Sequence, residues 1–363
     1  MRVFHISGDH FAELATLPAS IPDTGYLWVG AARPDFRAHI GELQEALQRW
    51  SGGQLVDLHI SDMANDQLPS HFDYTSWYDL LVFRRLALAS LSAVDSNGSS
   101  TNGCAPTMPQ AIDTQPVAFA VFDRVLLTVH PLDCQVRDYF ADRLRQQGEA
   151  GDLRGSARMP PSPADLMLRM VNHIVDGYLE LRRALSRQNG QLQQQLLESS
   201  DSFHGWKALL ESRNRLHLLD ETCEDQRAAV TEWIDSLDEW PAEDDSAARR
   251  EHELLRVRSR DVLEHIERVL AHVRRLESSA ETAVQIHFAE QGNRTNSIMR
   301  TLTVLTAIFM PLNLVTGFFG MNFEWLPLIH SVVGFWVTLG VMLALGFGLS
   351  MYFWRKRYLG SAR

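Results

Sequence analysis

The chain has 363 residues and a formal net charge of −11, with 34 Lys and Arg against 45 Asp and Glu. This acidic balance excludes nucleic acid as an expected partner, because surfaces that bind nucleic acid need an excess of positive charge. The cysteines Cys104, Cys134 and Cys223 lie far apart without CxxC spacing. They predict neither a zinc site nor a disulfide framework, and they suit a reducing cytoplasm.

The first 135 residues mix strand-like and helix-like segments. Residues 25–30, 78–89 and 117–129 are rich in Val, Leu, Phe and Tyr and predict strands. Residues 36–49 have the apolar spacing of a helix. Such alternation predicts an α/β domain over residues 1–135.

Two further stretches of this region are informative, the N-terminus and a polar segment. The N-terminal stretch MRVFHISGDHFAELATLP lacks an apolar core flanked by basic residues, so we expect no signal peptide and a domain on the cytoplasmic side. Residues 95–115 are rich in Ser, Asn, Gly, Thr and Pro, which predicts an exposed loop.

Residues 136–245 read mostly as helix. Three prolines between residues 151 and 163 interrupt the pattern, and the acidic segment 238–245 contains Pro241 and predicts a turn. Between and around these breaks the apolar spacing predicts helices at residues 133–147, 166–199, 203–220 and 224–237.

Residues 247–310 contain no proline. A single helix of this length would be about 95 Å long, at roughly 1.5 Å per residue. We therefore expect a stalk helix over residues 246–297 that continues into a membrane span and packs against partners as in a coiled coil. Such a helix would link a sensing domain mechanically to the membrane.

Two apolar segments follow the stalk. Residues 302–321 and 332–354 carry no charge, and each is long enough to cross the roughly 30 Å hydrocarbon layer. Basic residues flank only the outer ends, which places both termini in the cytoplasm. The expected parts are a first span at 298–321, an external loop at 322–330, a second span at 331–354 and a basic tail at 355–363.

The first span is unusual because polar residues share one of its faces. Residues spaced by three or four lie on the same side of a helix. A polar face within a span contacts protein or water rather than lipid, and either helix packing or the lining of a pore would explain it. The residues on this face are Met299, Leu302, Thr306, Met310, Asn313 and Gly317.

The first span closes on Gly320-Met321-Asn322, and here the chain resembles the CorA family of divalent-cation channels. In that family a GMN triplet follows the first of two C-terminal spans. The resemblance extends to residues 58–84, which match without a gap, with Asp62, Asn65, Asp73, Tyr78 and Val82 at recurrent positions. It also includes Arg260-Asp261-Val262, Thr295-Asn296, Phe309-Met310-Pro311-Leu312, Phe323-Glu324 and the tail Arg355-Lys356-Arg357-Tyr358-Leu359.

The resemblance implies an α+β membrane protein that assembles as a homopentamer in the inner membrane. Five first spans would line the pore, the long helices would form a cytoplasmic funnel, and the α/β domains would surround it. The ions that the family moves are Mg2+, Co2+ and Ni2+, while a ZntB-like branch moves Zn2+. Divalent cations, the lipid bilayer and further copies of the chain are therefore the expected partners, and no organic cofactor is implied.

The resemblance also implies roles for individual residues. Asn322 with Gly320 and Met321 would form a selectivity filter at the mouth, although Gly and Asn also suit a plain helix C-terminus. Glu324 would lie in the external loop. Asp62 and Asp261, from neighbouring subunits, would hold a regulatory Mg2+ that closes the channel. The implied pore-lining residues are Asn296, Met299, Leu302, Thr306, Met310, Asn313 and Gly317.

Departures from the family pattern leave the transported ion open. The family often has a second acid in the external loop, where this chain has Leu328. Asn313 stands where a threonine is expected, although its amide oxygen still accepts hydrogen bonds. The alternatives are a ZntB-like Zn2+ transporter, against which the intact Met321 argues, and a membrane-anchored coiled-coil scaffold without transport.

We do not expect an enzyme. The 14 histidines are dispersed, and His265 and His272, seven residues apart, are typical of an ordinary helix face. The sequence has no HExxH motif, no phosphate-binding loop and no nucleophile elbow.

Overall fold

The computed structural model describes two compact units, Met1–Ala280 and Glu281–Arg363. The first contains the predicted segments 1–135 and 136–245 together. The second contains the end of the long helix and the second apolar helix. The described residues are 1–8, 10–86, 114–150, 159–198, 202–240, 245–321 and 332–356.

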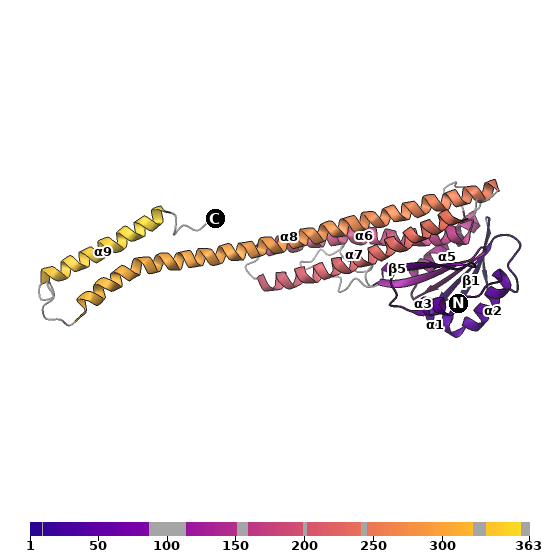
Figure 1. Ribbon diagram of the computed structural model, residues 1–363, viewed down its shortest axis with the longest axis horizontal. Helices are drawn as coiled ribbons and strands as arrows, with labels where there is room; N and C mark the ends of the chain where they lie inside the picture. Colours follow the sequence, from indigo (N-terminus) through magenta and orange to yellow (C-terminus); the bar gives the residue numbers. More distant parts are fainter. Residues whose placement is uncertain are drawn as a thin grey trace. The chain divides into compact units, whose positions relative to one another are not determined.

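A seven-stranded sheet forms the centre of the first unit, with the strand order β2-β1-β3-β7-β6-β5-β4 (Figure 1). Neighbouring strands are antiparallel except for β3 and β7, which pair in parallel. The strands are β1 (Arg2–Ser7), β2 (His10–Leu14), β3 (Tyr26–Ala32), β4 (His71–Tyr74), β5 (Asp79–Leu86), β6 (Thr114–Val121) and β7 (Val125–His130).

The sheet is covered on both faces. Its central strands are therefore apolar at almost every position rather than at every second one. In β3, Tyr26 and Trp28 join one buried cluster, whereas Leu27 and Val29 join the other. This division follows from the period of two along a strand. Three short helices cover the second face: α1 (Arg33–Ala38), α2 (Ile40–Ser51) and α3 (Asp57–Ala64).

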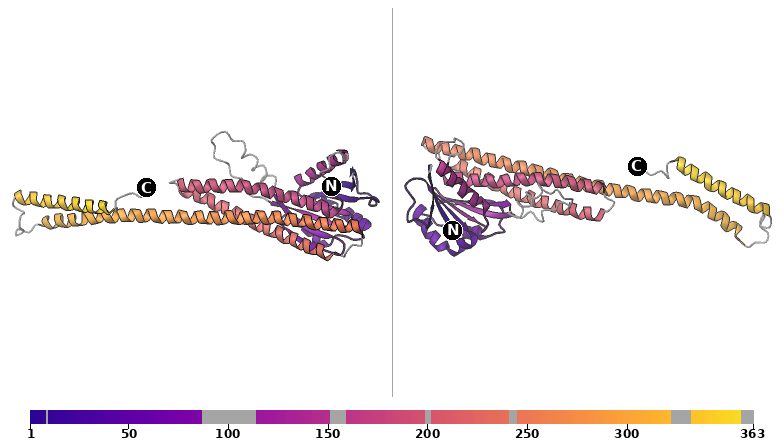
Figure 2. Two further views of the ribbon diagram at one scale, coloured as in Figure 1. Left: turned by 90° about the horizontal axis from the view of Figure 1, so that it is seen from above. Right: turned by 180° about the vertical axis from the view of Figure 1, so that it is seen from behind.

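Longer helices cover the first face. They are α5 (Gln135–Ala150), α6 (Pro163–Glu198), α7 (Ser202–Glu239) and the first part of α8 (Ser246–Phe319). Figure 2 shows α6 and α7 running alongside this part of α8. One contact that joins them is the hydrogen bond from Trp233 Nε1 to Ser259 Oγ at 2.9 Å, with both residues buried. The last helix, α9 (Val332–Arg355), belongs to the second unit.

The predicted α/β domain, long helix and two apolar C-terminal helices are all present. α8 runs without a break from Ser246 through Pro311 to Phe319, as the lack of earlier prolines predicts. Its N-terminal half packs against the first unit's core through residues such as Val262, Ile266 and Val273.

Several element predictions need correction. Residues 117–129 form a hairpin rather than one strand, because the chain turns at Asp123-Arg124. The two helices predicted at 203–220 and 224–237 are one helix, α7, since the intervening DETCE sequence holds neither Gly nor Pro. β1, β2 and β4 were not predicted. Of the loop predicted at 95–115, residues 95–113 lie outside the described residues and 114–115 begin β6.

Candidate functional site

Two helices are long and apolar enough to cross a membrane by length and composition. They are α8, whose apolar window lies in its C-terminal part, and α9. Only 6% of each apolar window is buried within the chain. In water this amount of exposed apolar surface would be unfavourable, so these windows suit a lipid or protein environment.

One side of the α8 span carries the residues that the sequence predicts to face a pore. Successive helical residues are rotated by about 100°. On that basis Met299, Leu302, Thr306, Met310, Asn313 and Gly317 all fall within about 40° of a single line along the helix. All six are exposed in the single chain. Because it holds the polar residues Thr306 and Asn313, we call this set of six residues the polar line.

The opposite side of α8 is partly covered. Val304 is 3% exposed, and Ile308, Pro311 and Val315 are half-buried. A Cβ placed on Gly346 of α9 would lie 3.6 Å from Leu312 Cδ1, which shows how closely the two helices pack. The second span thus covers a side of α8 other than the polar line, and leaves the polar line open to a partner or to water.

The threonine hydroxyls in this part of α8 have a fixed orientation. Thr306 Oγ1 donates to the Leu302 carbonyl at 2.9 Å, and Thr303 Oγ1 donates to the Met299 carbonyl at 2.8 Å. Since each hydroxyl proton is used by the backbone, the oxygen offers only its lone pairs. Thr306 on the polar line therefore accepts hydrogen bonds, as the water shell of a cation requires.

The GMN motif lies at the end of α8. The Gly320 amide donates to the Thr316 carbonyl at 2.9 Å, and a Cβ on Gly320 would lie 2.9 Å from that same oxygen. Gly320 is thus needed for a close backbone approach, and it is not among the described glycines with positive φ. Asn322, Glu324 and the predicted loop 322–330 lie outside the described residues.

Asn296 lies on α8 one turn before Met299, the first residue of the polar line. It is exposed. The Asn296 side chain lies about 80° around the helix from Thr306, at the edge of the polar line. Its predicted place at the cytoplasmic end of a pore remains a proposal.

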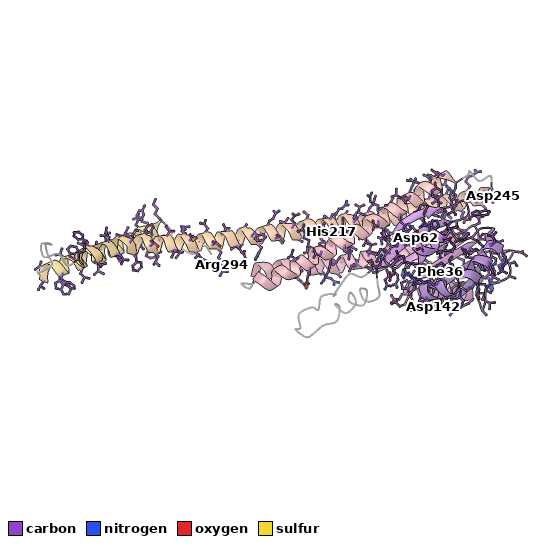
Figure 3. The ribbon with its side chains drawn as sticks, turned by 60° about the horizontal axis from the view of Figure 1, so that its bottom comes forward. Phe36, Asp62, Asp142, His217, Asp245 and Arg294 are labelled. Carbon is purple, nitrogen blue, oxygen red and sulfur yellow. The ribbon has the colours of Figure 1, made fainter. Side chains whose placement is uncertain are left out.

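The predicted regulatory carboxylates are both in the first unit. Asp62 lies on α3 (Figure 3) and is half-buried, while the Asp261 side chain on α8 is 55% exposed. Asp261 Oδ1 lies 3.7 Å from His265 Nε2. The predicted sharing of one ion by Asp62 and Asp261 of neighbouring subunits stays a proposal.

Other titratable groups do not assemble into a metal site. Among the described residues, no group of three His, Cys, Asp or Glu side chains could hold a metal ion. His272 Nε2 lies 2.6 Å from Ser186 Oγ, which ties α8 to α6. This contact is that of a packed helix face.

Sequence reasoning missed one concentration of charge. Arg33, Arg37 and Arg84 line a single cavity in the first unit. They come from α1 and β5, about fifty residues apart in the chain, and no local motif joins them. Only the pairing of the sheet brings them together.

The fold and this site define a class: a membrane protein with a large α+β body and two C-terminal spans, the first of which presents Thr306 and Asn313 on one exposed face. The family described as CorA-like Mg2+ transporter protein matches residues 55–357. This is most of the chain, and the chain therefore belongs to that family. The resemblance around the GMN motif is confirmed, and the family is one of transporters.

Similar proteins agree with this assignment. The cobalt/magnesium transport protein CorA of Thermotoga maritima is 25% identical over 200 residues, which cover 53% of this chain and 52% of that protein. The putative metal ion transporter YfjQ of Bacillus subtilis is 43% identical over 65 residues, or 18% of this chain and 20% of that protein. The matches thus span about half or less of these relatives.

The fold is shared along the whole chain. The complete structure of the CorA magnesium transporter from Methanocaldococcus jannaschii superposes with a TM-score of 0.72 and covers 98% of both chains, at 15% sequence identity. This likeness confirms the predicted architecture of an N-terminal α/β domain, a long helix and two apolar C-terminal helices.

Proposed function

We propose that this chain forms a channel for divalent cations, with Mg2+ as its main substrate and Co2+ and Ni2+ as further ones. The observation that carries the proposal is the polar line on α8, which α9 leaves uncovered. Family membership supports it, as do relatives whose names state magnesium or cobalt transport.

The chemistry of the polar line suits a hydrated ion. Mg2+ holds its water tightly and prefers near-ideal octahedral oxygen coordination. The free energy needed to remove that water would exceed what a few coordinating side chains could supply. Thr306 and Asn313 instead offer oxygen acceptors to the water shell, and Asn322 at the end of the span would select by size and hydrogen bonding.

Apolar residues alternate with the polar ones along the same line. Leu302 and Met310 are both exposed there, at 56% and 70%. Rings of such side chains would empty the pore of water when they approach one another, which stops ion flow without a charged gate. We propose these two positions as the gate, with Met299 below them.

The assembly that this requires is a ring of several copies. One helix presents only one line of lining residues, so a closed pore needs the same line repeated around an axis. We propose a homopentamer in the inner membrane, with both termini in the cytoplasm. The basic residues Arg294, Arg300, Arg355 and Lys356 lie at the outer ends of the two spans and support this topology.

The experiment is ion uptake into liposomes that contain a Mg2+-sensitive dye. Thr306→Val is compared with Thr338→Val. Both threonines donate to a carbonyl one turn earlier at 2.9 Å, but Thr338 is on α9 and does not lie on the polar line. Mg2+ entry that falls at least about tenfold in Thr306→Val and stays within about twofold in Thr338→Val supports the proposal.

Two further arms separate the alternatives. Asn322→Ala tests the filter, and a Zn2+ dye in parallel tests a ZntB-like activity. Entry of Zn2+ without Mg2+ would replace the proposed substrate. If neither ion enters liposomes that hold a folded oligomer, the channel proposal fails, and a membrane-anchored scaffold explains the long helix.

A further inference from the structure

A cavity of about 480 Å³ lies in the first unit. It opens where α1, the end of α3, the start of β6 and the residues after β7 meet. Its lining is mainly polar and carries three cations and one carboxylate. The charged residues are Arg33, Arg37, Arg84 and Asp66.

The three guanidinium groups bond only to neutral oxygen atoms. Arg37 Nη2 donates to the Ala64 carbonyl at 2.7 Å, and Arg84 Nε donates to Thr114 Oγ1 at 2.8 Å. Arg84 also donates to the Leu68 and Thr114 carbonyls, and Arg33 donates to the Pro116 carbonyl. Within the described part of the chain none of the three forms an ion pair, although Asp66 acts on Arg33 and Asp225 acts on Arg84 at longer range.

Arg33 is the least satisfied of the three. Its Nε is buried and has no hydrogen-bond partner among the described residues. Burial lowers the pKa of Arg33, Asp66 raises it, and Arg85, Arg84 and Arg37 lower it further. Burial is the largest of these effects, and Asp66 is the largest single charge acting on Arg33. A bound anion would accept from this donor and relieve the repulsion.

A fourth guanidinium adds positive charge behind the cavity. Arg85 is 3% exposed, and its two amino groups donate to the Leu86 carbonyl, Gln115 Oε1 and the Asp133 carbonyl. Asp133 Oδ1 lies 3.7 Å from Arg85 Nη2 and forms an ion pair with it, so Arg85 is partly neutralised and the three cavity arginines carry the positive charge.

We propose that this cavity binds a phosphate-bearing small molecule, whose phosphate is held by Arg33, Arg37 and Arg84. Guanidinium groups match phosphate oxygens in a bidentate geometry. Three positive charges suit a phosphate dianion as the ligand better than a singly charged carboxylate. The volume is within the range of small-molecule pockets and exceeds that of one phosphate. The ligand is therefore a phosphate ester such as a nucleotide, rather than free phosphate.

Binding is measured by isothermal titration calorimetry on the full-length protein in detergent, without Mg2+ so that ion binding does not contribute. The probes are AMP, inorganic phosphate and adenosine. We expect AMP to bind, phosphate to bind more weakly and adenosine not to bind. Raising the salt concentration should weaken AMP binding, because the contacts are between charges.

The variant is Arg37→Gln, and its matched control is Arg49→Gln. Both arginines are exposed and donate to a backbone carbonyl, but Arg49 lies on α2 outside the cavity. Loss of one charged hydrogen-bond donor should weaken AMP binding by about tenfold or more in Arg37→Gln and leave it unchanged in Arg49→Gln. Arg33→Lys is a second variant. It keeps the positive charge but loses the bidentate guanidinium group, and we expect it to weaken AMP binding.

The proposal is overturned if neither AMP nor phosphate binds the folded protein, if adenosine binds as tightly as AMP, or if the two glutamine variants behave alike. Equal affinity for phosphate and AMP would contradict the proposal that the ligand is a phosphate ester, and would identify the phosphate ion as the ligand. Ion flux is not involved, so these outcomes are independent of the channel proposal.

Discussion

Asp79 at the start of β5 titrates far from its usual range. Burial, together with the smaller effect of the nearby Asp123, raises its pKa to about 6. A carboxyl whose folded pKa lies above its unfolded value of about 4 destabilises the folded state once it ionises. The penalty is absent below about pH 4, grows between pH 4 and 6, and is constant above.

Replacing Asp79 removes this penalty. Asp79→Asn should stabilise the first unit by about 1–3 kcal/mol at pH 7.5 and have little effect at pH 4. Thermal unfolding of the full chain at both pH values measures the difference. Asp57→Asn, on the exposed start of α3, is the control and should not stabilise the chain at pH 7.5, because the helix dipole favours a negative charge there. Equal stabilisation at both pH values would mean that ionisation of Asp79 is not the cause.

Asn313 replaces the threonine that the family pattern leads one to expect. Its side chain is exposed on the polar line, about two helical turns before the GMN motif. Asn313→Thr should keep Mg2+ flux within about threefold, since a hydroxyl also accepts from the water shell. Asn313→Leu should reduce flux by at least about tenfold, because an apolar ring at this depth repels water. Mg2+ flux into liposomes measures the difference. Similar rates for Asn313→Leu and Asn313→Thr would show that Asn313 does not line the pore.

At the scale of elements, one buried carboxylate joins α6 to α8. The Asp165 side chain is 3% exposed and accepts from Arg169 Nε at 3.0 Å and from Arg258 of α8. Asp165 also lies in the first turn of α6, where the helix dipole favours a negative charge. The Arg258 contact is therefore the charged link between the two helices.

Breaking that link should loosen the start of α8. Arg258→Met leaves Asp165 with one cation and should cost about 1–3 kcal/mol. Arg268→Met, which removes an exposed pair with Glu264 on the same helix, is the control and should leave the unfolding midpoint unchanged. Urea unfolding followed by tryptophan fluorescence reports on this region, because Trp233 donates to Ser259 beside Arg258. Equal shifts for both variants would contradict the role of the link.

The sequence predicted long elements better than short ones, for physical reasons. α8 was predictable because 64 residues without proline, ending in an uncharged run, allow few alternatives to one helix. β4 has four residues, too few to show a period. The polar line was predictable because its spacing is local. The arginine cavity was not, because Arg33 and Arg84 meet only through the β3-β7-β6-β5 order of the sheet.

At the scale of the whole molecule, the polar line predicts the assembly. In detergent the particle should contain five copies of the 41.1 kDa chain, as native mass spectrometry would show. A bifunctional maleimide should link Met299→Cys between copies, because that side chain would face the axis. Val304→Cys, which is 3% exposed within its own chain, should link far less. A dimer, or equal linking of both variants, would contradict a ring lined by this face.

We propose that regulation by Mg2+ also belongs to the assembly. Asp62 and Asp261 of neighbouring copies would share one ion, and its release would free α8 to move. Asp62→Asn and Asp261→Asn should each keep flux high at an internal Mg2+ concentration that closes the unmodified channel. Because both act on one ion, the double variant should behave like either single one rather than adding to it. Glu264→Gln, an exposed neighbour of Asp261 on α8, should retain closure. If the Asp variants close like the unmodified protein while Glu264→Gln does not, the regulatory ion lies elsewhere on the stalk.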